Sequence, residues 1–521
     1  MIDVRRWVAS GRPHERVGPR AHRVGDHVHI QLRRVWPDQA EPFVAALHEE
    51  LADLPVAWVD VRLLDGLLVV GLADDDAAEV LGVEEAVVQA VEAAEERAGI
   101  ECNPFPEHRH GAPVDDEPLL RAAAEVAADV FAFGLSLTLR AVRAPRPPAG
   151  FDAEGLVGLV QNVPGLRRTF ARWVGRGTAE VSAGVAYALA GGLAQNVVGP
   201  VLGFAYHNLR LGELRARQEA WLGAEPRLYG PGAISAGSSE PIGRPLPRGP
   251  GPAERFAELT WVASLGSFVA TIPLTGSIER ALSMLASGAP KAARIGREAF
   301  GSHLSRDLGQ RGIVVLRPGT VRLLDQVDVV VVEDRLFTGD DAIRLERVAA
   351  ANGLDLAVVG VDGVAEVRRL QIAGRVVATV GGPSFTPLAA GDLPIGIAGR
   401  DGRAPDGSHV ICLDGLGDAA RILAACRPAR RASQESAHLS LAGAVGGALV
   451  AMAPAVGTRL PRVMTVIDTA ALVAVGNAVR HARRAENFDV DRDPGRTEEV
   501  PVLVPLSALT RCEDGQEAAS A

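Results

Sequence analysis

Long uncharged stretches on both sides of a strand-rich block restrict this chain more than any other feature. Four stretches contain no charged residue except Glu435 and Asp468, and they are residues 182–206, 259–277, 432–457 and 463–479. About 20 apolar residues cross the hydrocarbon core of a bilayer as one helix. Because a helix satisfies its own backbone hydrogen bonds, we interpret all four as membrane spans. Alanine and glycine dominate them, so the alternative is a set of buried helices in a soluble core.

Two weaker stretches complete a predicted set of six spans. Residues 119–142 are largely apolar but contain Glu125 and Asp129, and residues 281–296 are interrupted by a proline followed by a lysine. Six spans place both ends of the chain on one side of the membrane. Arginines near the spans favour the cytoplasmic side, and they are Arg140, Arg143, Arg146, Arg480, Arg483 and Arg484.

The overall composition narrows the class of partner. The 521 residues carry a formal net charge of −10, which gives no indication of a nucleic-acid partner. Lys291 is the only lysine, so a mechanism that needs a lysine beside a nucleotide has a single candidate. No two of the four cysteines form a CxxC pair, so they predict neither a disulfide framework nor a zinc site. The N-terminus lacks the apolar core of a secretory signal peptide.

The water-soluble parts show two different strand patterns. Residues 27–100 read as strand, helix, two strands and helix, which predicts a small ferredoxin-like α+β domain. Residues 312–430 contain continuous β-branched runs separated by amphipathic helices, which predict a doubly wound parallel sheet. Residues 224–252 are rich in Pro, Gly and Ser and read as a linker. Residues 486–521 read as an acidic, flexible tail.

Several segments, in order along the chain, resemble those of heavy-metal P-type ATPases. They are DVVVVED (328–334), FTGDDAIRLERVAAANGLD (337–355), LAAGDLPIGIAG (388–399) and VMTVIDTAALVAVGNAVR (463–480). They are similar to the phosphorylation strand of that family, its TGDN segment, its ALAxADVGIAxG motif and its sixth membrane helix. The resemblance covers about 240 residues and implies a HAD-like phosphorylation domain inserted between membrane helices.

The resemblance also assigns positions to the family's functional residues. Asp334 takes the position of the phosphorylated aspartate, and Thr338, Gly339 and Asp340 take that of the TGD segment beside the nucleotide and phosphate. Pro290 remains of the fourth-helix transport motif, whose cysteines are absent. Asp468 lies within a predicted span. It is interpreted either as a cation or helix-pairing group or as a tolerated polar residue between helices.

The residues that carry the family's chemistry are missing from these positions. Phosphoryl transfer needs a nucleophile, a nucleotide site and bound magnesium. Arg335, Leu336 and Phe337 replace the K-T-G that follows the phosphorylated aspartate, and Thr338 comes only four residues after Asp334. The large nucleotide-binding domain of the family therefore has no place here. Residues 380–387 replace the magnesium-binding GDGxND and contain no acid. The linker leaves no room for an actuator domain.

The N-terminal unit resembles the heavy-metal-associated domain that precedes many such pumps. The metal-binding CxxC of that domain should fall near residues 33–39, where no cysteine occurs. The resemblance therefore implies a structural or docking role without a metal site.

These observations predict an α/β membrane protein of five regions. They are a degenerate heavy-metal-associated, ferredoxin-like domain (1–112), transmembrane helices 1–4 with the linker 224–252 (113–298), a truncated HAD-like phosphorylation-type domain (299–432), helices 5–6 (433–485) and a flexible tail (486–521).

The resulting functional expectation is a catalytically inactive P-type ATPase homologue, or pseudoenzyme, in the cell membrane. It would be a multi-pass protein with cytoplasmic soluble domains, acting as a scaffold or regulatory partner of an intact cation-transporting ATPase. ATP and Mg²⁺ are expected for the family, but their sites are lost, so no cofactor is expected. One alternative is a cation-transporting component whose missing catalytic domains are supplied in trans. Another is a soluble binding protein.

Overall fold

The computed structural model describes most of the chain. The described residues are 21–24, 27–64, 66–73, 82–105, 116–144, 176–229, 234–235, 243–361, 363–399, 402–403, 405–453 and 460–486. The predicted tail, after Glu486, and the first 20 residues of the predicted N-terminal domain lie outside them.

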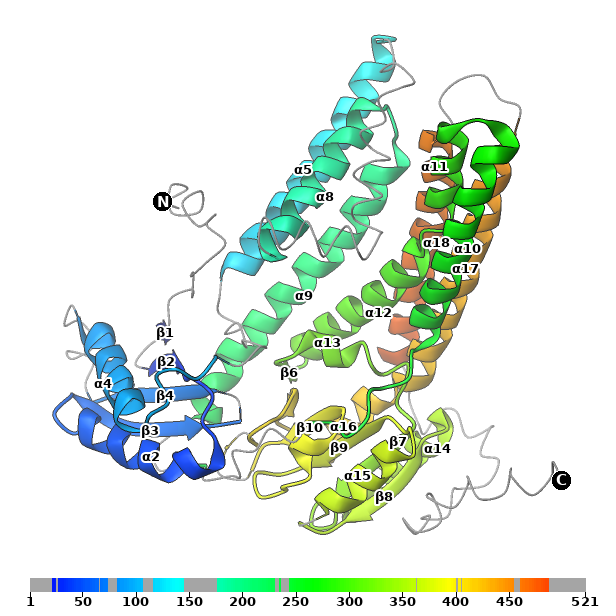
Figure 1. The fold of residues 1–521 in the computed structure, drawn as a ribbon. Coiled ribbons are helices and arrows are strands. Elements are labelled where there is room, and N and C mark those ends of the chain that lie inside the picture. Colours follow the sequence, from blue (N-terminus) through cyan, green and yellow to red (C-terminus); the bar gives the residue numbers. More distant parts are fainter. Residues whose placement is uncertain are drawn as a thin grey trace.

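The N-terminal unit is a sheet covered by two helices on one face (Figure 1). Its elements are β1 (Ala21–Val24), β2 (His27–Gln31), α2 (Pro37–Leu51), β3 (Val56–Arg62), β4 (Leu67–Leu72) and α4 (Val83–Arg97). The strand order is β1-β2-β4-β3-β5, with the two-residue β5 (Ile234–Ser235) contributed from far along the chain. Alternation along β2 directs Val28 and Ile30 into the core beneath the helices.

The other face of this sheet is docked against a long helix, α9 (Val198–Leu228). His27 Nδ1 and His29 Nε2 lie 2.7 and 3.1 Å from the same oxygen, Oε1 of Glu225 on α9. Around this polar contact, Trp221 and Tyr229 join a buried apolar cluster that also includes residues of the N-terminal sheet and of the α/β unit. Because side chains alternate along β2, one face of the strand packs in the core of the N-terminal unit and the other face contacts α9.

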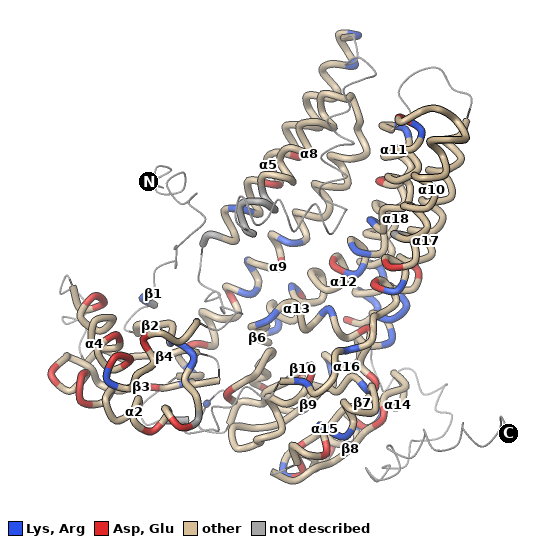
Figure 2. The backbone as a smooth tube through the Cα atoms, viewed as in Figure 1, with Lys and Arg blue, Asp and Glu red and all other residues tan. Residues whose placement is uncertain are grey.

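Helices form two arms that diverge at one end (Figure 1). One arm contains α5 (Asp116–Ala141), α8 (Arg176–Leu193) and α9, and the other contains α10 (Pro252–Thr275), α11 (Ile278–Ser287), α17 (Cys426–Met452) and α18 (Leu460–Glu486). A further helix, α12 (Lys291–Gln310), packs on α9 and on α18 and so joins the arms. Figure 2 shows few charged residues along the diverging parts of the arms, with Lys or Arg at the tip of the first arm and charges of both signs beside α11 at the tip of the second.

Three helices of the described residues are long and apolar enough to cross a membrane: Pro118–Ala141, Pro252–Thr275 and Leu460–Glu486. They correspond to the predicted spans 119–142, 259–277 and 463–479. The predicted span 432–457 forms most of α17, which is not among the three. The break between α11 and α12 at residues 288–290 divides the predicted span 281–296.

The predicted span 182–206 is wrong as a single helix, because the chain reverses direction between α8 and α9. Gln195 adopts a positive φ of 58°, and the Asn196 side chain accepts the N–H of Val198, the first residue of α9. On α5, the Arg140 guanidinium donates to the Gln195 carbonyl and Ser136 donates to the Asn196 carbonyl. Side chains of α5 therefore satisfy the backbone carbonyls of this turn. No charged residue within the stretch itself predicts that the helix is interrupted there.

The α/β unit is a six-stranded sheet with helices on both faces. Its strands are β6 (Val314–Val315), β7 (Val329–Glu333), β8 (Asp355–Val359), β9 (Val377–Gly381), β10 (Leu393–Ile397) and β11 (Val410–Cys412). The order is β6-β11-β10-β9-β7-β8, with only β6 antiparallel. The helical elements of the unit are α13 (Pro318–Val321), α14 (Gly339–Asn352), α15 (Val364–Ile372), the short 3-10 helix η1 (Leu388–Ala390) and α16 (Leu416–Leu423).

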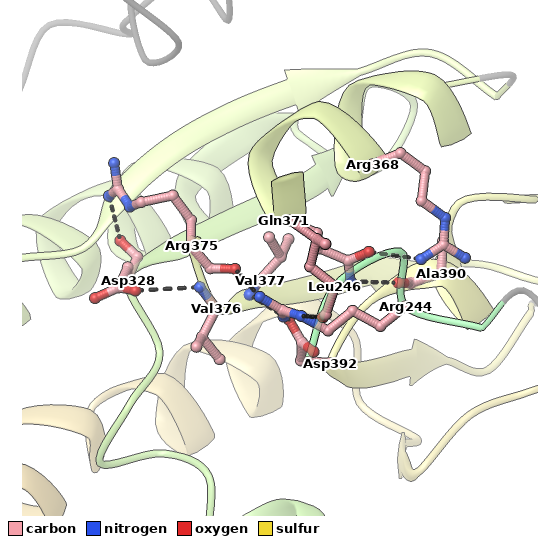
Figure 3. Close-up of polar contacts among 10 residues, drawn as sticks. All are labelled: Arg244, Leu246, Asp328, Arg368, Gln371, Arg375, Val376, Val377, Ala390 and Asp392. Carbon is pink, nitrogen blue, oxygen red and sulfur yellow. Dashed lines mark hydrogen bonds and ion pairs between the residues drawn. The ribbon is translucent and has the colours of Figure 1, made fainter. Parts of the chain in front are cut away.

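The predicted linker 224–252 is partly ordered. Its first residues continue α9 to Leu228, and residues 234–235 pair with β3. Farther on, Arg244 lies against the amino ends of the parallel strands (Figure 3). The Arg244 guanidinium pairs with Asp392 at 2.5 Å and donates to the Arg375 carbonyl at 3.0 Å. Residues 243–251 therefore form a strap against the α/β unit that leads into α10.

The docking of the N-terminal unit should depend on pH through Glu225. Burial alone would raise the pKa of Glu225, but hydrogen bonds from His29 and His27 outweigh it and hold the pKa below the ordinary 4.5. A lowered folded-state pKa stabilises the docked state above about pH 4.5, and this contribution is lost as the pH falls through the folded-state value. We expect acidification through this range to increase hydrogen exchange of the β2 amides, and Glu225→Gln to flatten that dependence.

Glu85→Gln, a change on the exposed side of α4, is the matched control and should behave as the unmodified protein does. An unchanged pH profile in Glu225→Gln would show that this carboxylate does not govern the docking.

Candidate functional site

Glu333 is the buried carboxylate at the carboxyl end of β7. Its side chain is almost fully buried, and Oε2 accepts the backbone N–H of Gly382, just beyond β9, at 2.7 Å. Asp334, which the sequence analysis placed at this strand end, lies one residue farther on and is exposed. Its Oδ1 accepts the N–H of the next residue, Arg335, at 2.7 Å. Four consecutive valines end directly before Glu333. This run predicts a buried strand, and it could have identified Glu333, in place of Asp334, as the carboxylate at the end of that strand.

A single tight turn connects β7 to α14. The backbone N–H groups of Leu336 and Phe337 donate to the carbonyl of Glu333, and both side chains pack against the main core. Thr338, Gly339 and Asp340 follow at once at the start of α14, and all three are exposed. These residues follow Asp334 closely in the chain and are separated from it by Leu336 and Phe337, whose side chains pack against the core.

The end of β9 is closed by an aromatic ring. Phe385 is buried and its ring lies so close to Gly381 that a Cβ there would be 2.1 Å from the ring carbon Cδ1. No group of three His, Cys, Asp or Glu side chains in the described part of the chain is arranged to hold a metal ion. At β7 and β9, the edge of the sheet where parallel α/β folds usually bind ligands therefore presents the buried Glu333 carboxylate bonded to backbone, the exposed Asp334 and the buried ring of Phe385.

A second candidate site lies between the membrane helices. The Lys291 Nζ is 2.5 Å from Oδ1 of Asp468 on α18 and 3.1 Å from the hydroxyl of Tyr187 on α8. That hydroxyl is 3.0 Å from the other oxygen of Asp468, and the ammonium also lies 4.3 Å from the centre of the Tyr187 ring. All three side chains are buried. Pro290 directly precedes α12, so the helix break there places Lys291 at the first position of α12.

The arrangement places Asp468 between three helices. Its carboxylate contacts Lys291 of α12 and Tyr187 of α8. Sequence reasoning considered Lys291 only as a possible partner of a nucleotide and missed its role in the membrane region. Because Lys291 is the only lysine and follows a proline inside an apolar segment, a search for an intramembrane counter-ion of Asp468 could have found it.

Removing either partner of this ion pair should destabilise the protein strongly. Asp468→Asn leaves a buried ammonium without its carboxylate, and Lys291→Met leaves the opposite charge, so each should lower stability by about 3–5 kcal/mol. The double variant Lys291→Met/Asp468→Asn should lose less than the sum of the two, because no charge remains buried. Thermal unfolding in detergent measures all three.

The matched control is Arg369→Met, which removes a salt bridge to Glu366 from an exposed position. It should change stability by less than about 1 kcal/mol. Additive losses in the double variant would contradict a direct interaction between Lys291 and Asp468.

Comparison with known proteins gives partial matches. No known family profile matches the chain. The protein named "Probable cation-transporting ATPase I" of Mycobacterium tuberculosis is 28% identical over 376 residues, which cover 64% of this chain and 23% of that protein. The protein of the same name from Mycobacterium leprae is 27% identical over 368 residues, 62% of this chain and 22% of that protein. The chain thus spans less than a quarter of the length of these relatives.

Among solved structures, a zinc-transporting PIB-type ATPase in its E2.Pi state aligns with 52% of this chain and 67% of that chain. The identity is 10% and the TM-score is 0.34, and no residue equivalence is drawn from it. The sequence matches therefore make this chain similar, over part of its length, to proteins named as probable cation-transporting ATPases.

Proposed function

We propose that this chain is a membrane subunit of a cation-transport system that does not itself transfer phosphate from ATP. In this proposal it acts as a scaffold or regulatory partner of an intact cation-transporting ATPase. The observation that carries the proposal is the turn from Glu333 to Thr338, which is too short to contain a nucleotide-binding domain and directs its apolar side chains into the core.

The chemistry of the strand end supports an inactive phosphorylation unit. Glu333 is bonded to the N–H of Gly382, and Asp334 is bonded to the N–H of Arg335. A carboxylate that accepts the phosphoryl group of ATP acts as the nucleophile, and it must face both the nucleotide and the bound magnesium. Neither carboxylate has a neighbouring lysine, because the only lysine of the chain is Lys291 in the membrane region.

The membrane cluster supports a changed role in transport. Lys291 follows Pro290, the remnant of the transport motif, and binds Asp468, the carboxylate of the last helix. A fixed ammonium thus lies where the resemblance would put a transported cation. In the proposal, this charge holds the helices together instead of exchanging with ions from solution.

The proposal also assigns a fold family to the N-terminal unit and to the α/β unit. The order β2-β4-β3 with α2 and α4 on one face fits a ferredoxin-like, heavy-metal-associated unit that has lost its metal loop. At the expected loop, the Arg34 guanidinium lies 4.5 Å from the centre of the Trp36 ring. The order β11-β10-β9-β7-β8 with helices on both faces fits a truncated HAD-like unit. We also propose a multi-pass membrane location with both units in the cytoplasm.

The mycobacterial relatives are much longer than the stretch that matches this chain. In these proteins, the matched stretch belongs to a polypeptide more than four times as long as that stretch. A region like this chain is therefore covalently joined there to extensive additional sequence. This observation favours, as the second candidate function, a transport component that works with catalytic domains supplied in trans.

Phosphorylation trapping tests the proposal. Purified full-length chain incubated with labelled ATP and Mg²⁺ and quenched in acid should carry no hydroxylamine-sensitive acyl phosphate, because its two candidate carboxylates are bonded to backbone N–H groups. An intact P-type ATPase treated in parallel is the positive control. Labelling that disappears in Asp334→Asn or Glu333→Gln would overturn the proposal.

Co-reconstitution separates the two candidate functions. A scaffold should alter the cation-dependent ATPase rate of an intact partner that is already active alone. A component completed in trans should give turnover only when both chains are present.

A further inference from the structure

The α5–α9 arm contains an imidazole between two carboxylates. His207 on α9 places Nδ1 2.7 Å from Oδ2 of Asp129 and Nε2 3.8 Å from Oε2 of Glu125, both on α5. Asp129 and Glu125 are buried, and the His207 side chain is 16% exposed. All three lie within or against the apolar helix Pro118–Ala141, and none of them belongs to the sites described above.

Glycines on the neighbouring helices make room for both carboxylates. A Cβ at Gly203, one turn before His207 on α9, would lie 2.3 Å from Oδ1 of Asp129. A Cβ at Gly184 on α8 would lie 3.5 Å from Oε1 of Glu125. The Asp129 carboxylate can approach the α9 backbone only because residue 203 has no side chain. The site is therefore formed jointly by α5, α8 and α9.

Charge balance indicates what this site binds. With both carboxylates ionised, the Nδ1–H of a neutral His207 imidazole donates the hydrogen bond to Asp129, and Nε2 carries no proton. A proton added to the second ring nitrogen, Nε2, creates an imidazolium between two carboxylates and reduces the net charge of the three groups from −2 to −1. Uncompensated charge is costly in a membrane interior, so proton uptake is favourable there. No metal-holding group of three such side chains occurs in the described residues.

We propose that His207, Asp129 and Glu125 form an intramembrane proton-binding site that is separate from the Lys291–Asp468 pair. The proton comes from hydronium, is bound at Nε2 of His207 and leaves water behind. The site rests on the membrane placement of α5 but not on loss of ATP hydrolysis, so it stands or falls separately from the scaffold proposal.

Other charged or titratable groups lie on the packed elements. They are Arg121 and Arg140 on α5, Tyr187 on α8, Tyr206 and Arg210 on α9, and Lys291, Arg294 and Glu298 on α12. Lys291 is close enough to act on Asp129 electrostatically, and Tyr206 donates a hydrogen bond to Glu298. Protonation of His207 is therefore sensed across the contact between the arms, because Asp129 interacts both with His207 and with Lys291.

Ring-nitrogen NMR of the full chain in lipid nanodiscs tests the site. Protein labelled with ¹⁵N-histidine reports all twelve imidazoles, and His207→Gln identifies the signal of His207. We expect this signal to titrate reversibly. Glu125→Gln and Asp129→Asn should each lower its midpoint by about one pH unit or more, because each removes a carboxylate that favours the imidazolium.

Glu258→Gln on α10 is the matched control, since it removes an exposed carboxylate from another helix, and it should leave the midpoint unchanged. Glu125→Gln keeps the hydrogen bond between Asp129 and His207, so it remains informative if Asp129→Asn misfolds. A His207 signal that does not titrate, or one whose midpoint is the same in Glu125→Gln, would overturn the proposal. Displacement of the proton by Zn²⁺ alone would overturn it in favour of a metal site.

Discussion

The interaction on which the membrane region depends is the buried pair between Lys291 and Asp468. An isolated charge between apolar helices costs several kcal/mol, and the cost falls only when the partner is held at hydrogen-bond distance. Here the partner comes from α18, and Tyr187 of α8 contacts both members. The pair therefore fixes three helices relative to one another, two of which belong to different arms.

Buried charges at the junction between the helices and the α/β unit are also paired with groups of opposite charge. Arg297 of α12 pairs with Asp325 in the segment that leads to β7, and Asp325 also accepts a hydrogen bond from Ser433 of α17. Burial raises the pKa of Asp325 above its ordinary value, although Arg297 opposes the shift. Arg322 pairs with Glu213 of α9 nearby. These contacts, with the Arg244 strap, attach the unit to the helices.

Much of the fold could be predicted from local patterns. Four valines before Glu333 predict a buried strand, and the alternation along residues 27–34 predicts a strand with two different faces. The approximate positions of three helices that are long and apolar enough to cross a membrane followed from the length of the apolar stretches. Prediction failed where distant residues decide the local structure. The turn at Gln195 is satisfied by Arg140 and Ser136, and the linker is held by Asp392, so neither carries a complete signal in its own sequence.

The candidate sites show the same division. The sequence by itself determined that no lysine follows Asp334, that no acid follows β9, and that the interval to Thr338 excludes an inserted domain, because these are statements about residue type and count. Only the tertiary structure decided that Glu333 is the buried carboxylate, that Lys291 neutralises Asp468, and that His207 lies between Asp129 and Glu125. Each of these depends on the distance between side chains on different elements, and helix packing sets that distance.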